Sequence, residues 1–250
     1  MTISLACDGC RNHTDLFPFT MAFQPIVHFP SRTVFAHEAL VRGIGGEGAH
    51  SILAQVGPDN RYAFDQACRV KAIELAARLG MQSKLSINFM PNAVYRAEAC
   101  IKLTLATAER CKFPTARIIF ELTEDERSQD LRHLQAIFSE YQKRGFLTAI
   151  DDFGTGYAGF EFLANFQPDI IKVAMSLVRD IDTNYAKQNI VAGLMLTCER
   201  MGVMVLGEGV ETVAELKTLS GLGVKYFQGF LFAKPAIECL PEVDWDRANG

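Results

Sequence analysis

The sequence lacks the features that mark membrane, secreted and nucleic-acid-binding proteins. None of its apolar runs approaches the length of a membrane span. Its first twenty residues, MTISLACDGCRNHTDLFPFT, have no basic start followed by an apolar segment, as a secretory signal would. Basic side chains are not in excess, because the formal net charge is −4, and binding to a nucleic-acid polymer needs a basic face. We therefore predict a cytoplasmic protein that binds neither a membrane nor a nucleic-acid polymer.

The sequence also lacks the cysteine pattern of a disulfide framework. Its seven cysteines are an odd number and are scattered through predicted helices and chain ends, which suits reduced thiols. Cys7, Cys10 and His13 could be half of a metal or redox site, but no fourth ligand with suitable spacing follows nearby. We interpret residues 1–19 as an unpaired tail, followed by one domain at residues 20–250 without a linker or an internal repeat.

Short β-rich runs alternate with longer amphipathic stretches from about residue 20 onward, which indicates βα units around a parallel sheet. We predict eight strands, at residues 21–27, 33–40, 84–89, 117–122, 146–152, 169–174, 202–208 and 225–230. Helices are predicted between them, at residues 61–79, 93–111, 128–144, 176–201 and 212–222.

The connection between the first two strands, residues 28–32, is too short for a helix, so these two strands should pair antiparallel. Eight strands with helices outside them predict an α/β fold, namely a (β/α)8 TIM-like barrel with its first strand antiparallel. An open doubly wound sheet is the alternative.

Polar side chains close seven of the predicted strands, where a barrel of this kind carries its chemistry. They are Glu38, Asn88, Glu121, the pair Asp151 and Asp152, Lys172, Glu208 and Gln228. One such residue is usually a surface or capping group, but the whole set indicates a single site. Five carboxylates at one mouth cannot all stay ionised without divalent cations, and neither histidine nor cysteine accompanies them.

This set of oxygen ligands favours Mg²⁺ or Mn²⁺ over zinc, and Mg²⁺ usually works on phosphate substrates. The adjacent Asp151 and Asp152 therefore predict two cations, bridged by Asp151, that clamp the attacking and leaving oxygens of an in-line displacement at phosphorus. Lys172 adds a positive charge that can orient a nucleophilic water or shield the phosphoryl group. A lone lysine at a strand end is more often a surface group, but its acidic company favours a role in the site.

Eight motifs in this order resemble the EAL domain of cyclic di-GMP phosphodiesterases over about residues 20 to 240: FQPIV, HEALVRG, LSINFMPN, FELTE, IDDFGTGY, DIIK, GEGVET and QGFLFAKP. The short segment between Arg42 and Arg61 resembles the compact type, which stands alone or is attached to a blue-light sensor domain. The resemblance implies an EAL phosphodiesterase domain at residues 20–250. It also implies hydrolysis of cyclic di-GMP to linear pGpG with two Mg²⁺ or Mn²⁺, inhibition by Ca²⁺ and a lowered level of this second messenger.

The resemblance further implies roles for single residues. One cation would be held by Glu38, Asn88, Glu121 and Asp151, and the other by Asp151, Asp152 and Glu208. The catalytic group would comprise Lys172, which assists the water, Gln228, which helps to place it, Glu208, and Glu124, which fixes the loop at residues 153–159. Substrate would contact Gln24, Leu40, Arg42, Asp152 and Gln228, with Arg42 on a phosphate.

One position departs from the family pattern. The lysine is usually followed by an apolar residue and an aspartate, whereas this chain has Lys172, Val173 and Ala174. Because residues two apart in a strand share a face, an aspartate at 174 could hold the ammonium or the water, and we expect Ala174 to slow the chemistry. The alternatives are a catalytically weakened EAL module that binds cyclic di-GMP and signals through a protein partner, and an interaction module that no longer binds the nucleotide.

The resemblance also suggests a homodimer, with an interface near residues 153–166. This segment holds Phe153, Tyr157, Phe160, Phe162 and Phe166, which are more rings than a solvent-exposed loop needs. The alternative is that most of these rings pack inward. The input signal and any sensor or regulatory partner are not encoded in a motif that we recognise.

Overall fold

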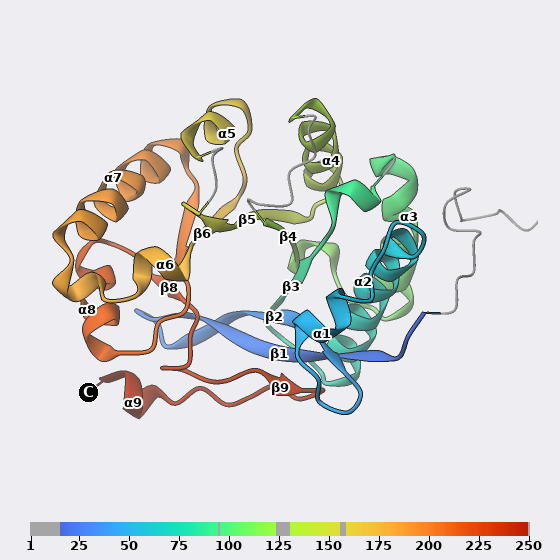
Figure 1. Cartoon of the computed structure of the whole chain (residues 1–250), viewed down its shortest axis with the longest axis horizontal. Coiled ribbons are helices and arrows are strands. Elements are labelled where there is room, and N and C mark those ends of the chain that lie inside the picture. The colour runs from blue at the N-terminus through green and yellow to red at the C-terminus, as the bar shows by residue number, and fades with distance from the viewer. Residues whose placement is uncertain (1–15, 95, 124–130, 156–158, 250) are drawn as a thin grey trace, which may run out of the picture.

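A computed structural model describes residues 16–94, 96–123, 131–155 and 159–249, and in this part of the chain eight strands close into a barrel (Figure 1). The barrel strands are β1 (Phe19–His28), β2 (Thr33–Gly43), β3 (Lys84–Asn88), β4 (Ile118–Thr123), β5 (Leu147–Phe153), β6 (Ile170–Val173), β7 (Met204–Gly207) and β8 (Tyr226–Phe227). They follow one another from β2 to β8, and β1 closes the ring between β8 and β2.

The first strand runs against the others. β1 pairs antiparallel with β2 from Phe19 opposite Gly43 to His28 opposite Thr33, and it also pairs antiparallel with β8, whereas neighbours from β2 to β8 are parallel. The predicted α/β TIM-like barrel with an antiparallel first strand is therefore confirmed. A short strand that we did not predict, β9 (Ala236–Ile237), pairs with β1 outside the ring.

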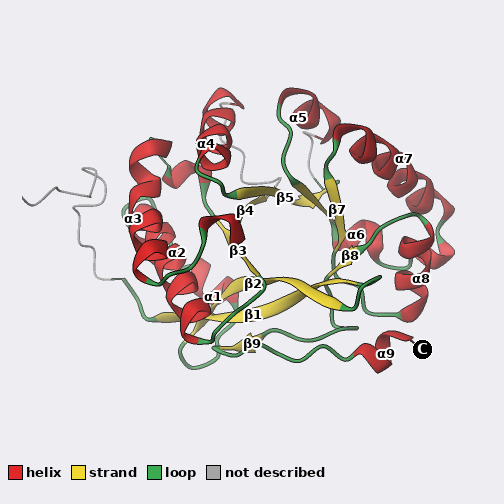
Figure 2. Cartoon of the chain, turned by 180° about the vertical axis from the view of Figure 1, so that it is seen from behind, coloured by secondary structure: helices red, strands yellow, loops and turns green. Residues whose placement is uncertain are grey.

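Helices lie outside the strands (Figure 2). They are α1 (Ala49–Leu53), α2 (Arg61–Arg78), α3 (Ala97–Arg110), α4 (Leu131–Lys143), α5 (Gly159–Asn165), α6 (Met175–Val178), α7 (Tyr185–Met201), α8 (Val213–Gly221) and α9 (Trp245–Asn249). Within the described segments, short 3₁₀ turns accompany them at Pro91–Ala93, Thr115–Arg117 and Ile181–Thr183. Helices α1, α5 and α9 lie outside the ranges predicted from the sequence.

The prediction of one helix at residues 176–201 was wrong. Asp180 adopts the left-handed conformation with φ of 56°, which an α-helix cannot contain. Asn184 then starts α7, because its side chain accepts hydrogen bonds from the backbone N–H groups of Ala186 and Lys187. The predicted helix at 93–111 begins only at Ala97, and the predicted strand at 225–230 is reduced to Tyr226 and Phe227.

A small apolar cluster forms a layer of its own next to the polar residues of the barrel. Its members are Ile26, Ala36, Ile119, Ala149, Ile170 and Leu206, each from a different strand and each at most 2% exposed. Each lies two positions from a polar residue, in the order Gln24, Glu38, Glu121, Asp151, Lys172 and Glu208. Because residues two apart share a face of a strand, the polar set forms the next layer above this apolar floor.

The larger core fills the space between the strands and the helices and includes the buried thiols of Cys68, Cys100 and Cys198. Cys7, Cys10 and His13 lie outside the described residues. Of the helices in the described segments, none is long and apolar enough to cross a lipid bilayer.

A buried carboxylate ties together the loops that follow β6 and β7. Glu215, only 1% exposed, accepts hydrogen bonds from the backbone N–H groups of Glu211 (2.9 Å), Thr212 (3.0 Å) and Asp180 (3.2 Å). The Thr212 hydroxyl accepts in return from the N–H of Glu215 (3.1 Å), which completes a capping box at the start of α8. One side chain therefore helps to fix the segment that begins three residues after Glu208.

We predict that Glu215→Ala lowers the free energy of unfolding by about 2 to 4 kcal/mol, because it leaves three backbone donors without an acceptor. Urea denaturation followed by circular dichroism measures the loss. Glu98→Ala, in the first turn of α3, is the control, since its pair with Arg96 is long (3.9 Å) and exposed, and it should cost less than about 1 kcal/mol. Equal losses for the two variants would contradict the role given to Glu215.

Candidate active site

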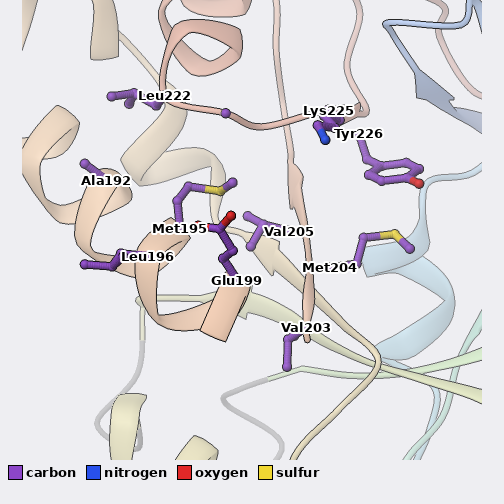
Figure 3. A pocket seen from close by; sticks show the side chains of 11 residues that line it. Ala192, Met195, Leu196, Glu199, Val203, Met204, Val205, Leu222, Lys225 and Tyr226 are labelled. Carbon is purple, nitrogen blue, oxygen red and sulfur yellow. The ribbon is translucent and has the colours of Figure 1, made fainter. Parts of the chain in front are cut away.

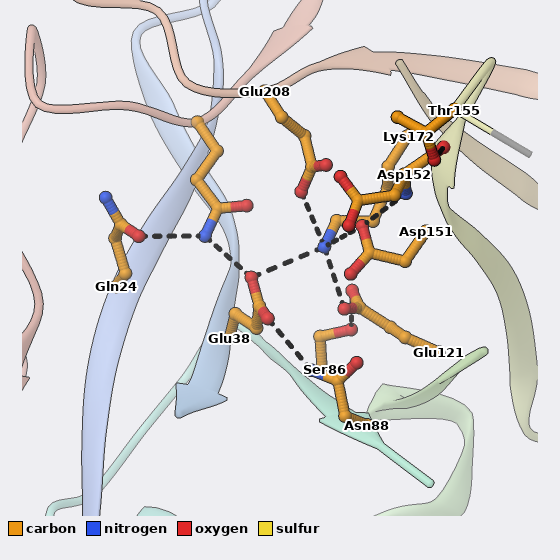
Figure 4. Close-up of polar contacts among 11 residues, drawn as sticks. Gln24, Glu38, Ser86, Asn88, Glu121, Asp151, Asp152, Thr155, Lys172 and Glu208 are labelled. Atoms are coloured by element: carbon orange, nitrogen blue, oxygen red, sulfur yellow. Dashed lines mark hydrogen bonds and ion pairs between the residues drawn. The ribbon is translucent and has the colours of Figure 1, made fainter. Parts of the chain in front are cut away.

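The polar residues of the barrel converge at the carboxyl ends of its strands (Figure 4). The structure brings together Glu38 from β2, Asn88 from β3, Glu121 from β4, Asp151 and Asp152 from β5, Lys172 from β6, and Glu208 and Gln228 from the residues directly after β7 and β8. Glu38 does not close its strand as predicted, because β2 continues for five residues, to Gly43.

Lys172 lies at the centre of this group. Its side chain is 1% exposed, and its ammonium contacts four carboxylates: Glu208 at 2.7 Å, Glu121 at 2.8 Å, Asp151 at 3.0 Å and Glu38 at 3.3 Å. Burial alone would lower the pKa of Lys172, but these carboxylates raise it well above its ordinary value. The ammonium therefore stays charged, and Lys172 is not a surface group.

The carboxylates differ in their affinity for protons. Burial raises the pKa of Glu121 to about 8 and that of Glu208 well above its ordinary value, against the opposing effect of Lys172. Burial also acts to raise the pKa of Asp151, but Lys172 and hydrogen bonds from Glu208 and from the N–H of Asp152 lower it overall. One ammonium does not balance this many buried carboxylates, so the site lacks positive charge.

Two groups of carboxylates have the spacing of cation sites. Glu38, Glu121 and Asp151 form one group, Asp151, Asp152 and Glu208 form the other, and within each group the oxygens lie within 4.8 Å of one another. Asp151 is common to both groups. The donors are all hard oxygens, a set that fits Mg²⁺ or Mn²⁺.

A break in the regular pairing of β5 lets two adjacent aspartates serve one site. Consecutive side chains of a strand normally point to opposite faces. Here the register between β5 and β6 shifts between Ile150 and Phe153, and Asp152 adopts the left-handed conformation with φ of 53°. An irregularity of this kind re-aims a side chain, so Asp152 joins Asp151 at the mouth.

Two glutamines support Glu38 from the side of β1 and β8. The amide nitrogen of Gln228, a 4% exposed residue, donates to Glu38 (2.8 Å) and to the side-chain oxygen of Gln24 (3.2 Å), and Gln24 in turn donates to the backbone oxygen of Ala233 (3.1 Å). The side-chain oxygen of Gln228 is buried and accepts no hydrogen bond from the described residues. It is therefore an open acceptor beside the carboxylates.

The remaining predicted residues lie around this centre. Leu40 and Arg42 follow Glu38 at intervals of two along β2, which places them on the same face beyond the carboxylates. The guanidinium of Arg42 donates to the backbone oxygen of Val41 (2.7 Å), and burial lowers its pKa against the opposing effect of Glu38. Glu124 lies outside the described residues, as does part of the loop at 153–159.

Ser86 was missed by the sequence analysis. It is fully buried, and its hydroxyl donates to Glu121, while Asn88 two residues later donates to Glu38 (2.9 Å). The signal was present in the sequence, because positions 86 and 88 share one face of β3. Ser86 therefore orients a carboxylate of the first group.

Ala174 follows β6 directly and is fully buried. It is the N-cap of α6, with φ of −53° and ψ of 143°, and its N–H donates to the backbone oxygen of Phe153 (3.2 Å). The effect of this alanine on activity stays a prediction.

The rings proposed for a dimer interface are divided between the interior and the surface. Phe153 is 6% exposed, and Phe166 packs on Phe138 with ring centroids 4.4 Å apart, whereas Phe160 is 58% exposed. Tyr157 and the side chain of Phe162 lie outside the described part of the chain. The inward-packing alternative is therefore correct for Phe153 and Phe166, and a homodimer stays a prediction.

A separate pocket of about 480 Å³ lies at the amino ends of β7 and β8 (Figure 3). Apolar side chains such as Met195, Leu196 and Val203 line it together with the charged residues Glu199 and Lys225. It shares no residue with the carboxylate groups, so the pocket and the carboxylate site are distinct.

Known proteins share both this sequence pattern and this fold. The family model described as EAL domain matches residues 17–235. The solved structure of a standalone EAL protein from Vibrio cholerae O395, in its c-di-GMP-bound form, has a TM-score of 0.90 and 49% identity and covers 94% of this chain and 99% of that chain. Klebsiella pneumoniae BlrP1, solved with manganese and cyclic di-GMP, has a TM-score of 0.86 and 34% identity over 92% of this chain and 59% of its own.

Curated relatives are longer proteins. The blue light- and temperature-regulated antirepressor BluF of Escherichia coli is 29% identical over 225 residues, which are 90% of this chain and 56% of BluF. The cyclic di-GMP phosphodiesterase PdeF of the same species is 31% identical over 163 residues, 64% of this chain and 22% of PdeF. The chain thus spans about half or less of these relatives.

The raised pKa of Glu121 predicts that the metal-free protein loses stability as pH rises. The folded state keeps a proton that the unfolded chain releases between its ordinary pKa and about 8, so the free energy of unfolding falls across that window. In EDTA we expect Tm to fall by roughly 5 °C between pH 5.5 and pH 8, and Mn²⁺ to reverse the loss by binding the folded state.

Glu121→Gln is the matched variant, because it removes this titration and keeps the size of the side chain. Its Tm in EDTA should depend less on pH than that of the unchanged chain. Scanning calorimetry at several pH values measures both. An identical pH dependence in the two proteins would contradict the shift assigned to Glu121.

Proposed function

The chain belongs to the EAL domain family, and we propose that it hydrolyses cyclic di-GMP to linear pGpG with two Mg²⁺ or Mn²⁺ at the mouth of the barrel. The observation that carries this proposal is the position of Asp151, which belongs to two groups of closely spaced carboxylates. A carboxylate shared in this way is suited to bridge two cations.

The relatives support the choice of substrate. The Vibrio protein was solved with c-di-GMP and the Klebsiella protein with manganese and cyclic di-GMP, and PdeF is named a cyclic di-GMP phosphodiesterase. The substrate is a cyclic dinucleotide with two phosphodiesters, and such anions match a site that is completed by divalent cations.

Glu38, Asn88, Glu121 and Asp151 would hold one cation, and Asp151, Asp152 and Glu208 the other. The bound cations would supply positive charge to the attacking and leaving oxygens at phosphorus. Two observations indicate that these residues suit divalent cations. The donor atoms are all oxygens, and the carboxylates around Lys172 outnumber its single positive charge.

The side chains of the protein orient the water and the phosphate. The ammonium of Lys172 stays protonated, so it donates hydrogen bonds to the attacking water or to a phosphoryl oxygen and does not remove a proton. Gln228 is fixed through its amide nitrogen, which leaves its oxygen to accept a hydrogen bond from the water. The oxygen of the water forms the new P–O bond as the bond from phosphorus to the 3′ oxygen breaks. One proton of the water passes to the leaving 3′ oxygen and the other remains on the new phosphate group, from which it is released to solvent, so that the products are a 5′ phosphate and a 3′ hydroxyl.

Substrate is placed by residues around this centre. Arg42 would contact a phosphate from its position on β2 beyond Glu38, and Gln24, Leu40 and Asp152 would line the site. Glu124 would fix the loop that follows β5. A homodimer, a cytoplasmic location, inhibition by Ca²⁺ and a sensor or regulatory partner stay predictions.

A weakened module that binds cyclic di-GMP and acts through a protein partner is not favoured, because a receptor has no need for two groups of cation ligands around a buried lysine. If the protein is an enzyme, Ala174 would slow the reaction without changing its course.

Chromatography of cyclic di-GMP incubated with the protein and Mg²⁺ or Mn²⁺ tests the proposal, and accumulation of pGpG is the expected result. Binding in Ca²⁺ without any turnover in Mg²⁺ or Mn²⁺ would favour the receptor.

Asp151→Asn should abolish nearly all hydrolysis while leaving the fold intact, because it weakens the ligand shared by both cations. Turnover and Mn²⁺ content should be measured on the same sample. Asp169→Asn is the matched control at the other end of the barrel, where Asp169 accepts from the N–H of Thr148 (2.8 Å). Normal turnover and metal content in Asp151→Asn would refute the bridging role.

Lys172→Ala should lower kcat by about 10² to 10⁴, the range for a positioned group that orients a water or stabilises charge. Its affinity for Mn²⁺ should be retained or increased, because a competing cation next to the carboxylates is removed. Steady-state kinetics and titration with Mn²⁺ check both, with Lys102→Ala on the exposed side of α3 as control. A loss of stability with little change in kcat would contradict the catalytic role.

A further inference from the structure

A buried ion pair lies on α2, among the side chains that pack against β3 and β4. The guanidinium of Arg69 contacts the carboxylate of Asp65 one helical turn earlier at 2.7 Å, and the two side chains are 0% and 1% exposed. Charged residues are rarely buried this completely. The residues assigned to the proposed reaction do not include this pair.

Asp65 holds the turn that follows β3. One of its carboxylate oxygens accepts a hydrogen bond from the backbone N–H of Met90 at 2.8 Å. Met90 lies two residues after Asn88 and directly before the 3₁₀ turn at Pro91–Ala93. The chain is therefore fixed from the helix side immediately after Asn88.

Arg69 contacts three aromatic rings, one directly after β3, one in β4 and one in α4. Its guanidinium carbon lies 5.1 Å from the ring centroid of Phe120, 5.5 Å from that of Phe89 and 5.8 Å from that of Tyr141, and it donates to the hydroxyl of Tyr141 at 2.8 Å. Phe89 and Phe120 also contact each other edge to face, at 6.0 Å. A cation at these distances is attracted to the rings.

These two rings are the direct neighbours of two oxygen ligands. Phe89 follows Asn88 and Phe120 precedes Glu121, and consecutive residues of a strand point to opposite faces. The rings thus face α2 and Arg69, while Asn88 and Glu121 face the interior of the barrel. A hydrogen bond from the N–H of Phe89 to the backbone oxygen of Glu121 (3.0 Å) joins the two strands at this level.

The alternative is that the pair only stabilises the fold. However, a buried ion pair often contributes no more stability than apolar residues of the same size, so stability alone does not account for a pair in this place. Its contacts instead converge on the backbone next to Asn88 and on the rings beside Asn88 and Glu121.

We propose that Asp65 and Arg69 are positioning residues that fix Asn88 and Glu121, and with them the spacing of the first group of cation ligands. The proposal rests on the proposed function, from which it takes the metal-binding role of these two residues. In the described part of the chain, Asp65 and Arg69 contact none of the clustered carboxylates, and they act through the ends of β3 and β4.

The test replaces the pair by apolar residues, in the double variant Asp65→Leu/Arg69→Met. Affinity for Mn²⁺ is measured by electron paramagnetic resonance, and kcat and KM with cyclic di-GMP at saturating Mn²⁺. Loss of a residue that orients metal ligands typically costs 10- to 100-fold, so we expect the dissociation constant for Mn²⁺ to rise by about that factor. We also expect kcat to fall by about tenfold, and KM to change by less than about threefold.

Leu194→Ala on α7 is the control for a general loss of stability, because Leu194 is 2% exposed and packs on another side of the barrel. It should lower the midpoint of urea denaturation and leave the affinity for Mn²⁺ unchanged. Wild-type affinity and kcat in the double variant would overturn the proposal. An equal loss of Mn²⁺ affinity in Leu194→Ala would also overturn it, since the effect would then follow stability alone.

Arg69→Lys keeps the positive charge and replaces the double variant in this test if the double variant does not fold. An ammonium lacks the planar fork that joins Asp65 to Tyr141, so this variant should bind Mn²⁺ about three- to tenfold more weakly, and unchanged binding would overturn the proposal. If the unchanged chain binds Mn²⁺ but does not hydrolyse cyclic di-GMP, the proposed function fails while the Mn²⁺ affinities still decide the positioning role. If it binds no Mn²⁺, both proposals fail.

Discussion

The crowding of carboxylates around one buried ammonium is the constraint on which the rest of this structure depends. Lys172, whose side chain is 1% exposed, contacts four carboxylates at 2.7–3.3 Å, so the protein alone does not neutralise its own charges. The raised pKa of Glu121 and of Glu208 expresses that shortage. Divalent cations bound by these carboxylates would relieve it, and the folding energy that holds the acids together must come from elsewhere in the barrel.

The barrel supplies that energy with its two apolar layers. The floor around Ile26 and Ile119 excludes water directly below the carboxylates, and the larger core joins the strands to the helices. The alternation of side chains along each strand then sets the apolar floor and the polar mouth two residues apart. A register shift in β5 interrupts this alternation and places Asp151 and Asp152 side by side at the mouth.

The residues that position the carboxylates lie on two sides of the strands. Ser86, Asn88 and Gln228 hold carboxylates by hydrogen bonds inside the barrel, whereas Asp65 and Arg69 act on the same strands from the helix side. Arg42 lies farther along β2, on the side from which an anionic substrate would approach. The site is therefore built on strands, which hold it more rigidly than loops would.

The sequence was enough to predict the α/β barrel, its antiparallel first strand and the polar residues at the strand ends, except that Glu38 lies within β2, because alternation along strands and short connections are local properties. It did not determine the break of the predicted helix 176–201 at Asp180, the two-residue length of β8, or the register shift that re-aims Asp152. Nor did it reveal that Lys172 would contact four carboxylates, or that Arg69 would lie against Phe89 and Phe120. Tertiary structure decided these features, because each depends on contacts between segments far apart in the chain.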